Sequence, residues 1–435
     1  MPTAPFLSPS LALTLAFAVA LTAGLLLKFW LASRQIRHVA RHRASVPSAF
    51  ARRIPLAAHQ KAADYTVVKT RFGLLEGALG AAILLGWTLL GGLHALNQVL
   101  LNELGSGMAQ QLALLVGFVL ISGVIDLPAT LYQTFVIEQR FGFNKTSLRL
   151  WLTDLLKNTL VGALIGLPMA ALILWLMGAA GPLWWLWAWG FWMGFNLLLM
   201  GVYPTFIAPL FNQFKPLEDE TLKARVTALM QRCGFSAKGL FVMDGSRRSA
   251  HANAYFTGFG ASKRVVFYDT LLRQLTPGEV EAVLAHELGH FKHRHILKRM
   301  AGLFALTLAG FALLGWLSTQ VWFYTGLGVS PNISLNPALP AAPNDALALL
   351  LFLLTVPVFT VFLSPLFALR SRRDEFEADA YAAAHAQGSD LASALLKLYE
   401  DNASTLTPDP VYVKFYYSHP PASERLARMP APASS

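Results

Sequence analysis

Residues 284–290 read Leu-Ala-His-Glu-Leu-Gly-His, so two histidines stand four positions apart with a glutamate directly after the first. On a helix, positions i and i+4 lie on one face, which lets His286 and His290 point at one metal ion. Glu287 is then placed to act on a water molecule beside that metal. Upstream, Thr276 begins a Thr-Pro-Gly-Glu capping box. The pattern therefore predicts a helix that starts near Thr276 and carries part of a metal site.

The cysteine count narrows the choice of metal ligands. Cys233 is the only cysteine, so the ligands must be histidines and carboxylates. Zinc held by two histidines and one carboxylate keeps a position open for water and can hydrolyse a peptide bond. The alternative is an amphipathic helix with solvated histidines. Glu375 and Asp379 share a face of the helical segment 371–380, which is either a solvated surface or the source of the third ligand.

The composition indicates a membrane protein. Of the 435 residues, 55% are hydrophobic and 14% are charged, with a mean hydropathy of +0.47, whereas soluble domains carry about 25% charged residues. A spanning helix needs about 20 predominantly apolar residues. Seven such runs are predicted, at Leu11–Leu31, Gly73–Leu96, Leu112–Leu131, Thr159–Met177, Leu183–Val202, Ala301–Tyr324 and Ala346–Leu369.

The distribution of basic residues predicts how these runs are oriented. No lysine or arginine occurs in 72–139, 158–213 or 301–369. By the positive-inside rule, the basic segments outside these ranges face the cytoplasm, and the N-terminus lies on the opposite side. The net charge of +11 therefore comes mostly from basic residues that set the membrane orientation, and anionic lipid is their expected neighbour. We expect membrane lipid, and no nucleic acid, among the partners.

The longest segment between the predicted membrane helices is expected to be a soluble domain. It contains a predicted helix at 221–233, short strands at 239–243, 254–257 and 264–268, and turns at 244–246 and 258–260. An edge strand of such a sheet can pair with an extended substrate and lay its scissile bond across the metal. A purely structural hairpin is the alternative. The Pro/Ala-rich tail at 430–435 is expected to be disordered.

Five longer motifs carry a resemblance to a known family. They are Leu131–Lys145 (Leu-Tyr-x-Thr-Phe-Val-Ile-Glu-x-Arg-x-Gly-Phe-Asn-Lys), Val202–Leu217 (Val-Tyr-Pro-Thr-Phe-Ile-Ala-Pro-Leu-Phe-Asn-x-Phe-x-Pro-Leu), His251–Gly258 (His-x-Asn-Ala-Tyr-Phe-x-Gly), His286–His290, and Ser371–Asp379 followed by Tyr417–Leu426. In these motifs, which occur in order over most of the chain, the protein resembles the integral-membrane zinc metalloproteases that include the type I CAAX prenyl endopeptidase.

The resemblance implies a multi-pass α-helical membrane protein. Seven transmembrane helices would form a barrel around a water-filled chamber, with a thermolysin-like α+β zinc metalloprotease domain on the cytoplasmic side. The expected parts are helices one to five at 1–203, the metalloprotease domain at 204–300, helices six and seven at 301–370, and the C-terminal part of the catalytic domain at 371–435.

The resemblance also assigns roles to individual residues. One zinc ion per chain would be bound by His286, His290 and Glu375, with Glu287 as the catalytic base. Asp379 would orient a ligand, and His419 would steady the oxyanion with Arg425 nearby. Asn253 and the backbone of Ala254 would hold the substrate. His295 matches a residue common in the family, whereas His293 is expected to be a surface residue.

Two departures bear on source and substrate. Glu377 stands where eukaryotic relatives often carry glutamine, and the chain has no dilysine tail. A bacterial source would put the protein in the inner membrane, with the catalytic domain cytoplasmic and the N-terminus periplasmic, and a eukaryotic source would put it in the endoplasmic reticulum membrane. Because bacteria do not prenylate CAAX proteins as eukaryotes do, the expected substrate is either a lipidated C-terminal peptide or an unlipidated membrane protein cut for quality control.

Three other classes of protein are considered. A site-2-like intramembrane protease would carry its motif inside an apolar span, but Lys292 and Arg294 follow the motif directly. A zinc-stabilised membrane scaffold would not need Glu287. A transporter is expected to show internal repeats, and none is found in the sequence. The sequence thus favours a zinc-dependent membrane endopeptidase acting on a peptide or protein substrate.

Overall fold

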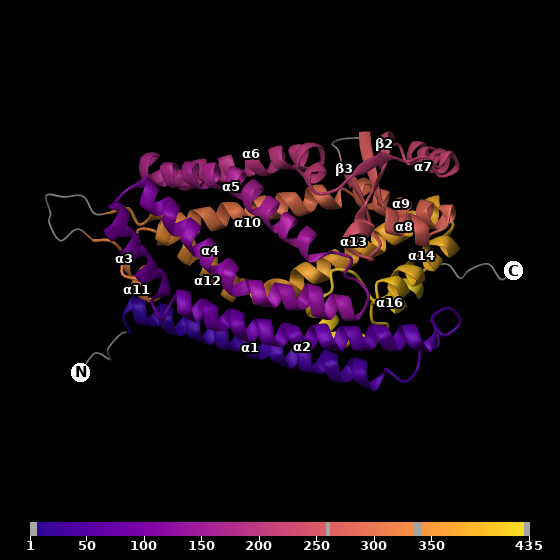
Figure 1. Ribbon diagram of the computed structural model, residues 1–435, viewed down its shortest axis with the longest axis horizontal. Coiled ribbons are helices and arrows are strands. Elements are labelled where there is room, and N and C mark those ends of the chain that lie inside the picture. The colour runs from indigo at the N-terminus through magenta and orange to yellow at the C-terminus, as the bar shows by residue number, and fades with distance from the viewer. Residues whose placement is uncertain (1–6, 258–261, 334–341, 430–435) are drawn as a thin grey trace, which may run out of the picture.

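The computed structural model describes residues 7–257, 262–333 and 342–429. The turn predicted at 258–260 and the tail at 430–435 lie outside these residues. Figure 1 shows an elongated molecule, with long helices running along its length and the sheet and most of the shorter helices gathered at one end. We call this the polar end.

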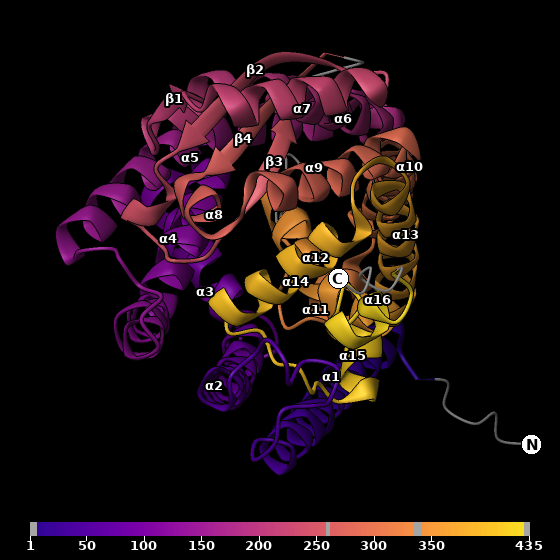
Figure 2. The ribbon, with the colours of Figure 1, turned by 90° about the vertical axis from the view of Figure 1, so that its right-hand side faces the viewer.

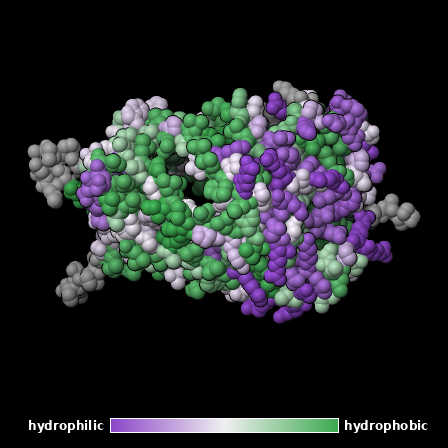
Figure 3. All heavy atoms as spheres, in the orientation of Figure 1, coloured by the Kyte–Doolittle hydropathy of each residue, from purple (hydrophilic) through white to green (hydrophobic). Residues whose placement is uncertain are grey.

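The long helices carry most of the exposed large apolar side chains among the described residues. They are α1 (Pro9–Arg41), α2 (Leu56–Trp87), α3 (Gly92–Leu104), α4 (Met108–Tyr132, continued by the π-helix η1, Gln133–Glu138), α5 (Leu148–Ala179), α6 (Trp184–Val202), α10 (His295–Leu317), α12 (Asp345–Thr360) and α13 (Ser364–His385). Among the described residues, six helical spans are long and apolar enough to cross a membrane, and the bent pair α2/α3 makes a seventh. Figure 3 shows that apolar residues cover this part, whereas hydrophilic residues gather at the polar end.

These helices close into a ring. Contacts run from α1 to α2 and α3, then through α4, α5, α6 and α10 to α12, which packs back against α1. Figure 2 shows the helices arranged around an interior, and Figure 3 shows an opening among apolar residues on one face. The predicted barrel of membrane helices is therefore confirmed.

Two predicted spans differ from the observed helices. The run predicted at Gly73–Leu96 crosses a break of 46° between α2 and α3, where Gly91 adopts a left-handed conformation with φ of 80°. The run predicted at Ala301–Tyr324 passes the end of α10 and enters the short helix α11 (Val321–Thr325). Hydropathy is continuous across both breaks, so it could not locate them.

The polar end contains a four-stranded sheet of described residues in the order β1-β2-β4-β3. Its strands are β1 (Phe214–Pro216), β2 (Ser236–Met243), β3 (Ala254–Thr257) and β4 (Ser262–Tyr268), and β2 and β4 are parallel while the other pairs are antiparallel. The three predicted strands are present, and β1 is an addition. The surrounding helices are α7 (Glu220–Arg232), α8 (Asp269–Gln274), α9 (Pro277–Lys292), α14 (Gly388–Asp401), α15 (Pro410–Tyr416) and α16 (Ala422–Leu426).

One core joins the sheet to α9. Val265 and Phe267 of β4 and Leu284 and Leu288 of α9 are fully buried in the same apolar cluster. Burying side chains of this size contributes about 1.5–3 kcal/mol each. The opposite face of α9 packs against α13, the continuation of the last membrane helix. The helix of the His-Glu-x-x-His motif is thus held between the sheet and the membrane helices.

Candidate active site

Helix α9 begins as its sequence predicts. The Thr276 hydroxyl accepts a hydrogen bond from the backbone N–H of Glu279, and the Glu279 carboxylate accepts one from the backbone N–H of Thr276. Glu279 also accepts from Ser393 and Lys397 of α14, each at 2.7 Å. The capping box therefore both starts α9 and fastens it to α14.

A glycine inside the motif sets the distance between α9 and α13. A Cβ atom at Gly289 would lie 2.9 Å from Cα of Ala378 and 3.1 Å from Cβ of Tyr381. Both distances are too short for ordinary packing, so only glycine lets the two helices approach this closely. The approach brings Glu375, one turn from Ala378, against the two histidines of the motif.

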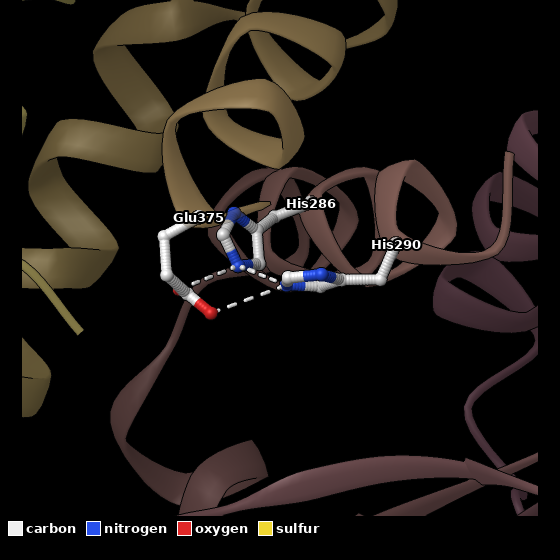
Figure 4. Close-up of side chains that lie close together, drawn as sticks. All are labelled: His286, His290 and Glu375. Atoms are coloured by element: carbon white, nitrogen blue, oxygen red, sulfur yellow. Dashed lines mark hydrogen bonds and ion pairs between the residues drawn. The ribbon is translucent and has the colours of Figure 1, made fainter. Parts of the chain in front are cut away.

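His286, His290 and Glu375 converge on one point (Figure 4). Their facing atoms are 3.3 Å apart between the two histidine Nε2 atoms, 3.5 Å between His286 and Glu375, and 3.4 Å between His290 and Glu375. Ligands at about 2.0–2.1 Å from one tetrahedral ion would be separated by about 3.3–3.4 Å. The spacing of these three donors therefore fits a tetrahedral metal ion.

The burial of Glu375 points the same way. Its side chain is 3% exposed, and its Oε2 atom has no hydrogen-bond partner within the described part of the chain. A buried carboxylate oxygen without a partner is costly, and a bound cation would satisfy it.

His286 is oriented by a buried ion pair. Its Nδ1 atom lies 2.8 Å from Asp379, and Arg425 donates to both oxygens of Asp379 at 2.8 and 2.6 Å. The side chains of Asp379 and Arg425 are 8% and 9% exposed. A carboxylate at Nδ1 fixes that nitrogen as the donor, so the lone pair of Nε2 is free for a metal.

His290 is oriented by a different chain of residues. Its Nδ1 atom lies 3.0 Å from Nδ1 of His295, and the other nitrogen of His295 lies 3.0 Å from Glu377. His295 is 1% exposed, whereas the side chain of Glu377 is 53% exposed. Sequence reasoning noted both residues without finding this relay, because the turn after α9 that folds His295 back is not visible in a motif.

The electrostatics of the site reflect this crowding. Burial lowers the pKa of His286, but the carboxylates of Asp379 and Glu375 outweigh it and raise that pKa to about 9. Burial and the neighbouring His286 lower the pKa of His290 to about 4. The carboxylates of Asp379 and Glu375 thus make the site favourable for positive charge. Burial, with Glu375 nearby, raises the pKa of Glu287.

His419 and Arg425 lie on the open side of the site. The Nε2 atom of His419 is 3.5 Å from Glu375, and its side chain is 63% exposed. Both residues line a cavity of about 780 Å³ that also reaches Lys69 of α2 and His251 beside the sheet. The structure therefore brings His419 to the carboxylate of Glu375 with free space in front of it.

Strand β3 runs beside the motif helix. Phe256 of β3 and Phe291 of α9 pack edge to face with ring centroids 5.6 Å apart. Within the described residues β3 pairs with β4 alone, so its other edge is open. Asn253 is exposed at the start of this strand, and its side chain accepts from the backbone N–H of Ala254 at 2.8 Å.

Comparison with known proteins places the chain among membrane peptidases. The family model for peptidase family M48 matches residues 216–433, and the one for the CAAX prenyl protease N-terminal region with five membrane helices matches residues 35–213. The chain is 40% identical to CAAX prenyl protease 1 homolog of Arabidopsis thaliana over 316 residues, 72% of each chain. It is 36% identical to CAAX prenyl protease 1 of Saccharomyces cerevisiae over 331 residues, 74% of this chain and 73% of that one.

The chain belongs to peptidase family M48. The crystal structure of S. mikatae Ste24p shares the fold, with a TM-score of 0.88 and 30% identity, over 98% of this chain and 99% of that one. The protein is thus a multi-pass integral membrane metalloendopeptidase that resembles the CAAX prenyl proteases. The family implies a metal cofactor, a peptide or protein substrate and a membrane environment.

Another motif of this M48 chain supports the sheet from the membrane side. The Phe143 ring stacks on His251 at 4.4 Å, and the backbone of Asn144 bridges to Ser249. His251 also lies 4.0 Å from Glu138, which accepts hydrogen bonds from the Tyr65 hydroxyl. The segment 131–145 therefore connects α2 to the chain around Asn253, directly before β3. Sequence reasoning recognised the motif and missed this role.

Proposed function

We propose that the protein is a zinc endopeptidase in which His286, His290 and Glu375 hold one zinc ion. The supporting observation is the set of 3.3–3.5 Å separations among the three donor atoms, together with the unpartnered oxygen of Glu375. When bound, zinc polarises the scissile carbonyl and makes water a better nucleophile near neutral pH. Asp379 and Arg425 keep His286 in the tautomer that binds metal.

Glu287 acts as general base and general acid in this proposal. Its carboxylate lies close enough to His286 and Glu375 for both to shift its pKa. It accepts the proton from the attacking water and delivers it to the leaving amine, a contribution of about 10²–10⁴-fold. His419 donates a hydrogen bond to the developing oxyanion, and one such donor is worth about 2.7–4 kcal/mol. Its exposed side chain, with Nε2 3.5 Å from Glu375, supports that assignment.

The open edge of β3 supports binding of an extended substrate. Backbone groups of Ala254 and the side chain of Asn253 would hold the peptide as an added strand across the zinc. The cavity from His419 to Lys69 offers room for the part of the peptide beyond the cleaved bond. We propose a lipidated C-terminal peptide as the substrate, because the relatives that match over most of the chain are named CAAX prenyl proteases. Quality-control cleavage of unlipidated membrane proteins is the second candidate.

The basic segments between apolar runs support an orientation with the polar end in the cytoplasm and the N-terminus outside. In a bacterium this would be the inner membrane, and in a eukaryote the endoplasmic reticulum. The catalytic unit would combine residues 204–300 with 371–435, and the membrane helices would comprise 1–203 and 301–370. Membrane lipid is an expected neighbour, and nucleic acid is not.

The test compares wild type with Glu287→Gln, both purified in detergent. Each is given a prenylated CAAX peptide, the same peptide without its lipid, and an unfolded membrane protein. Bound zinc is measured by elemental analysis. We expect one zinc per chain in both proteins and cleavage by the wild type alone, fastest for the prenylated peptide.

Each other outcome has a defined meaning. If the wild type cleaves all three substrates equally, the proposed substrate class changes from lipidated peptides to membrane proteins cut for quality control. If pure Glu287→Gln cleaves at the wild-type rate, Glu287 is not the general base. Absence of zinc from the wild type would remove the metal site itself.

A further inference from the structure

A second cavity lies away from the catalytic centre, where α5 begins. It has a volume of about 540 Å³ and lies between the first turns of α5, residues 209–213 after α6, and the turn η5 (Gly245–Arg247). These three segments are distant in sequence, and the cavity exists only because they meet. The lining residues differ from those of the cavity that reaches His419.

The charged side chains that line this cavity are all cationic. Arg149 and Lys157 stand eight residues apart on one stripe of α5, and Arg247 and Arg248 face them from the sheet side. Two carboxylates contact the cavity wall: Asp154 pairs with Arg248 at 2.8 Å, and Asp244 accepts a hydrogen bond from the backbone N–H of the lining residue Gln213 at 2.8 Å. Subtracting these two negative charges from the four positive charges leaves a local excess of two.

Among the described residues, three of the four cations have no acidic partner, and only Arg248 is paired with a carboxylate. Arg149 and Arg247 are exposed, and neither makes an ion pair with any described residue. Lys157 donates to the backbone carbonyl of Leu210 at 2.8 Å, and Arg248 donates to Asn212 at 3.0 Å as well as to Asp154. Lys157 and Arg248 thus build the wall of the cavity, and the guanidinium groups of Arg149 and Arg247 are free to bind an anion.

The position of the cavity along α5 places it at the membrane surface. The helix has 32 residues, more than the approximately 20 needed to cross the hydrocarbon. Lys157 is its last charged residue, and the next charge in the chain is Lys215. Beside the basic stripe, Leu148, Leu152 and Leu156 are 55%, 52% and 60% exposed. A ligand here would have an anionic group in the cavity and an apolar part along these leucines.

We propose that this cavity binds the phosphate headgroup of an anionic phospholipid. Two arginines can donate several parallel hydrogen bonds to phosphate oxygens, which a lysine cannot do in the same geometry. The acyl chains would lie along the exposed leucines of α5. A lipid held in this way connects a membrane helix to the turn before β3, and so to the catalytic domain.

Basic residues that only set the orientation of the membrane helices need not line a cavity. Arg52 and Arg53 serve as a comparison, because both are exposed basic residues in the loop before α2 and neither lines this cavity. Their charges can attract anionic lipid over a distance of about one Debye length, but they do not form a pocket for one headgroup.

The test uses the full chain in nanodiscs of neutral phosphatidylcholine to which phosphatidylglycerol is added. Lipid bound per protein is measured by native mass spectrometry, and the thermal midpoint Tm is measured in parallel. The variant Arg149→Gln/Arg247→Gln is compared with Arg52→Gln/Arg53→Gln, which removes the same charge. We expect one tightly bound phosphatidylglycerol and a higher Tm in wild type and in the control, and about 30-fold weaker binding in the cavity variant.

Further arms separate the possible ligands. Inorganic phosphate and glycerol phosphate are titrated in detergent. If either raises Tm as strongly as phosphatidylglycerol does, the ligand of the cavity is a soluble phosphate and not a lipid. The variant Arg149→Lys/Arg247→Lys keeps the positive charges but lacks the planar, two-pronged donor geometry of arginine. We expect it to recover only part of the affinity for phosphatidylglycerol. Equal losses in the two glutamine variants, or no retained phosphatidylglycerol in the wild type, would overturn the proposal.

Discussion

Two polar networks, at opposite ends of the helix ring, hold this protein together by different means (Figure 1). At the polar end, His286, Glu375, Asp379 and Arg425 form a buried cluster of ionisable groups. At the far end, Asn97 of α3 accepts from Gln110 of α4 at 2.8 Å and donates to Asn332 at 2.9 Å.

The far network also fixes the start of α12. Asn332 and Asn344 exchange hydrogen bonds between side chain and backbone at 2.7 and 3.1 Å, and Gln111 accepts from the backbone N–H of Ala346 at 2.9 Å. Neutral amides join segments without the desolvation cost of buried charges. In these two networks, charged groups lie where they can bind metal and move protons, and neutral amides lie where only position matters. If so, damage to the first network should lower activity and damage to the second should lower stability alone.

The largest effect is expected at Glu375 of α13, the carboxylate proposed to bind the metal. Glu375→Gln replaces an anionic ligand by a neutral amide, so zinc is lost and kcat/KM falls by about a thousandfold or more. Elemental analysis and peptide cleavage measure the two losses, and a chelator added to the wild type should reproduce both. Full zinc content in the variant would mean that another carboxylate is the ligand.

The next effect concerns the contact between α9 and α13. Gly289→Ala adds a Cβ that meets Ala378 at 2.9 Å, so α13 must shift and carry Glu375 with it. Because a displacement near 1 Å can cost about 10²-fold, we expect kcat/KM to fall tens of times. Gly123→Ala in α4 is the matched control, since a Cβ there meets nothing within 4 Å. Equal activity of the two variants would show that α9 and α13 accommodate the added Cβ without displacing Glu375.

The residue that orients His286 is expected to matter for metal affinity. Asp379→Asn keeps the shape of the side chain but weakens the fixed tautomer of His286 and leaves Arg425 without its carboxylate. We expect zinc affinity to fall by about 10–100-fold, measured by competition with a fluorescent chelator. A variant that binds zinc as tightly as the wild type would confine Asp379 to a packing role.

The relay behind His290 should respond less. Glu377 is 53% exposed, and glutamine can still accept the hydrogen bond from His295. Glu377→Gln is therefore expected to change zinc affinity by less than about tenfold, in the same competition assay. A loss as large as that of Asp379→Asn would mean that the two histidines depend equally on charged partners.

The smallest effect on activity is expected at the far end. Asn97→Ala leaves Gln110 and Asn332 without their partner, which costs about 1–3 kcal/mol of stability. The thermal midpoint should fall by several degrees while kcat/KM at low temperature stays at the wild-type value. A fall in kcat/KM with an unchanged midpoint would show that this end communicates with the active site.

The sequence by itself determined the features that depend on neighbouring residues. The capping box at Thr276 and the i, i+4 spacing of His286 and His290 act within one or two turns, so they could be read directly. The apolar runs predicted the membrane helices for the same reason, because hydropathy is a property of a continuous window. It could not show the break at Gly91, which depends on one local conformation inside a continuous apolar run.

Only the tertiary structure decided which distant groups meet. Glu375 was one of two acidic residues on a helix face until α13 packed on α9, and that contact depends on Gly289 lacking a side chain. The hydrogen bond from His290 to His295 needs the turn at Arg294, whose φ is 56°. The basic cavity at α5 needs three segments separated by as much as a hundred residues. Local patterns specify elements, whereas sites between elements arise from packing across the whole chain.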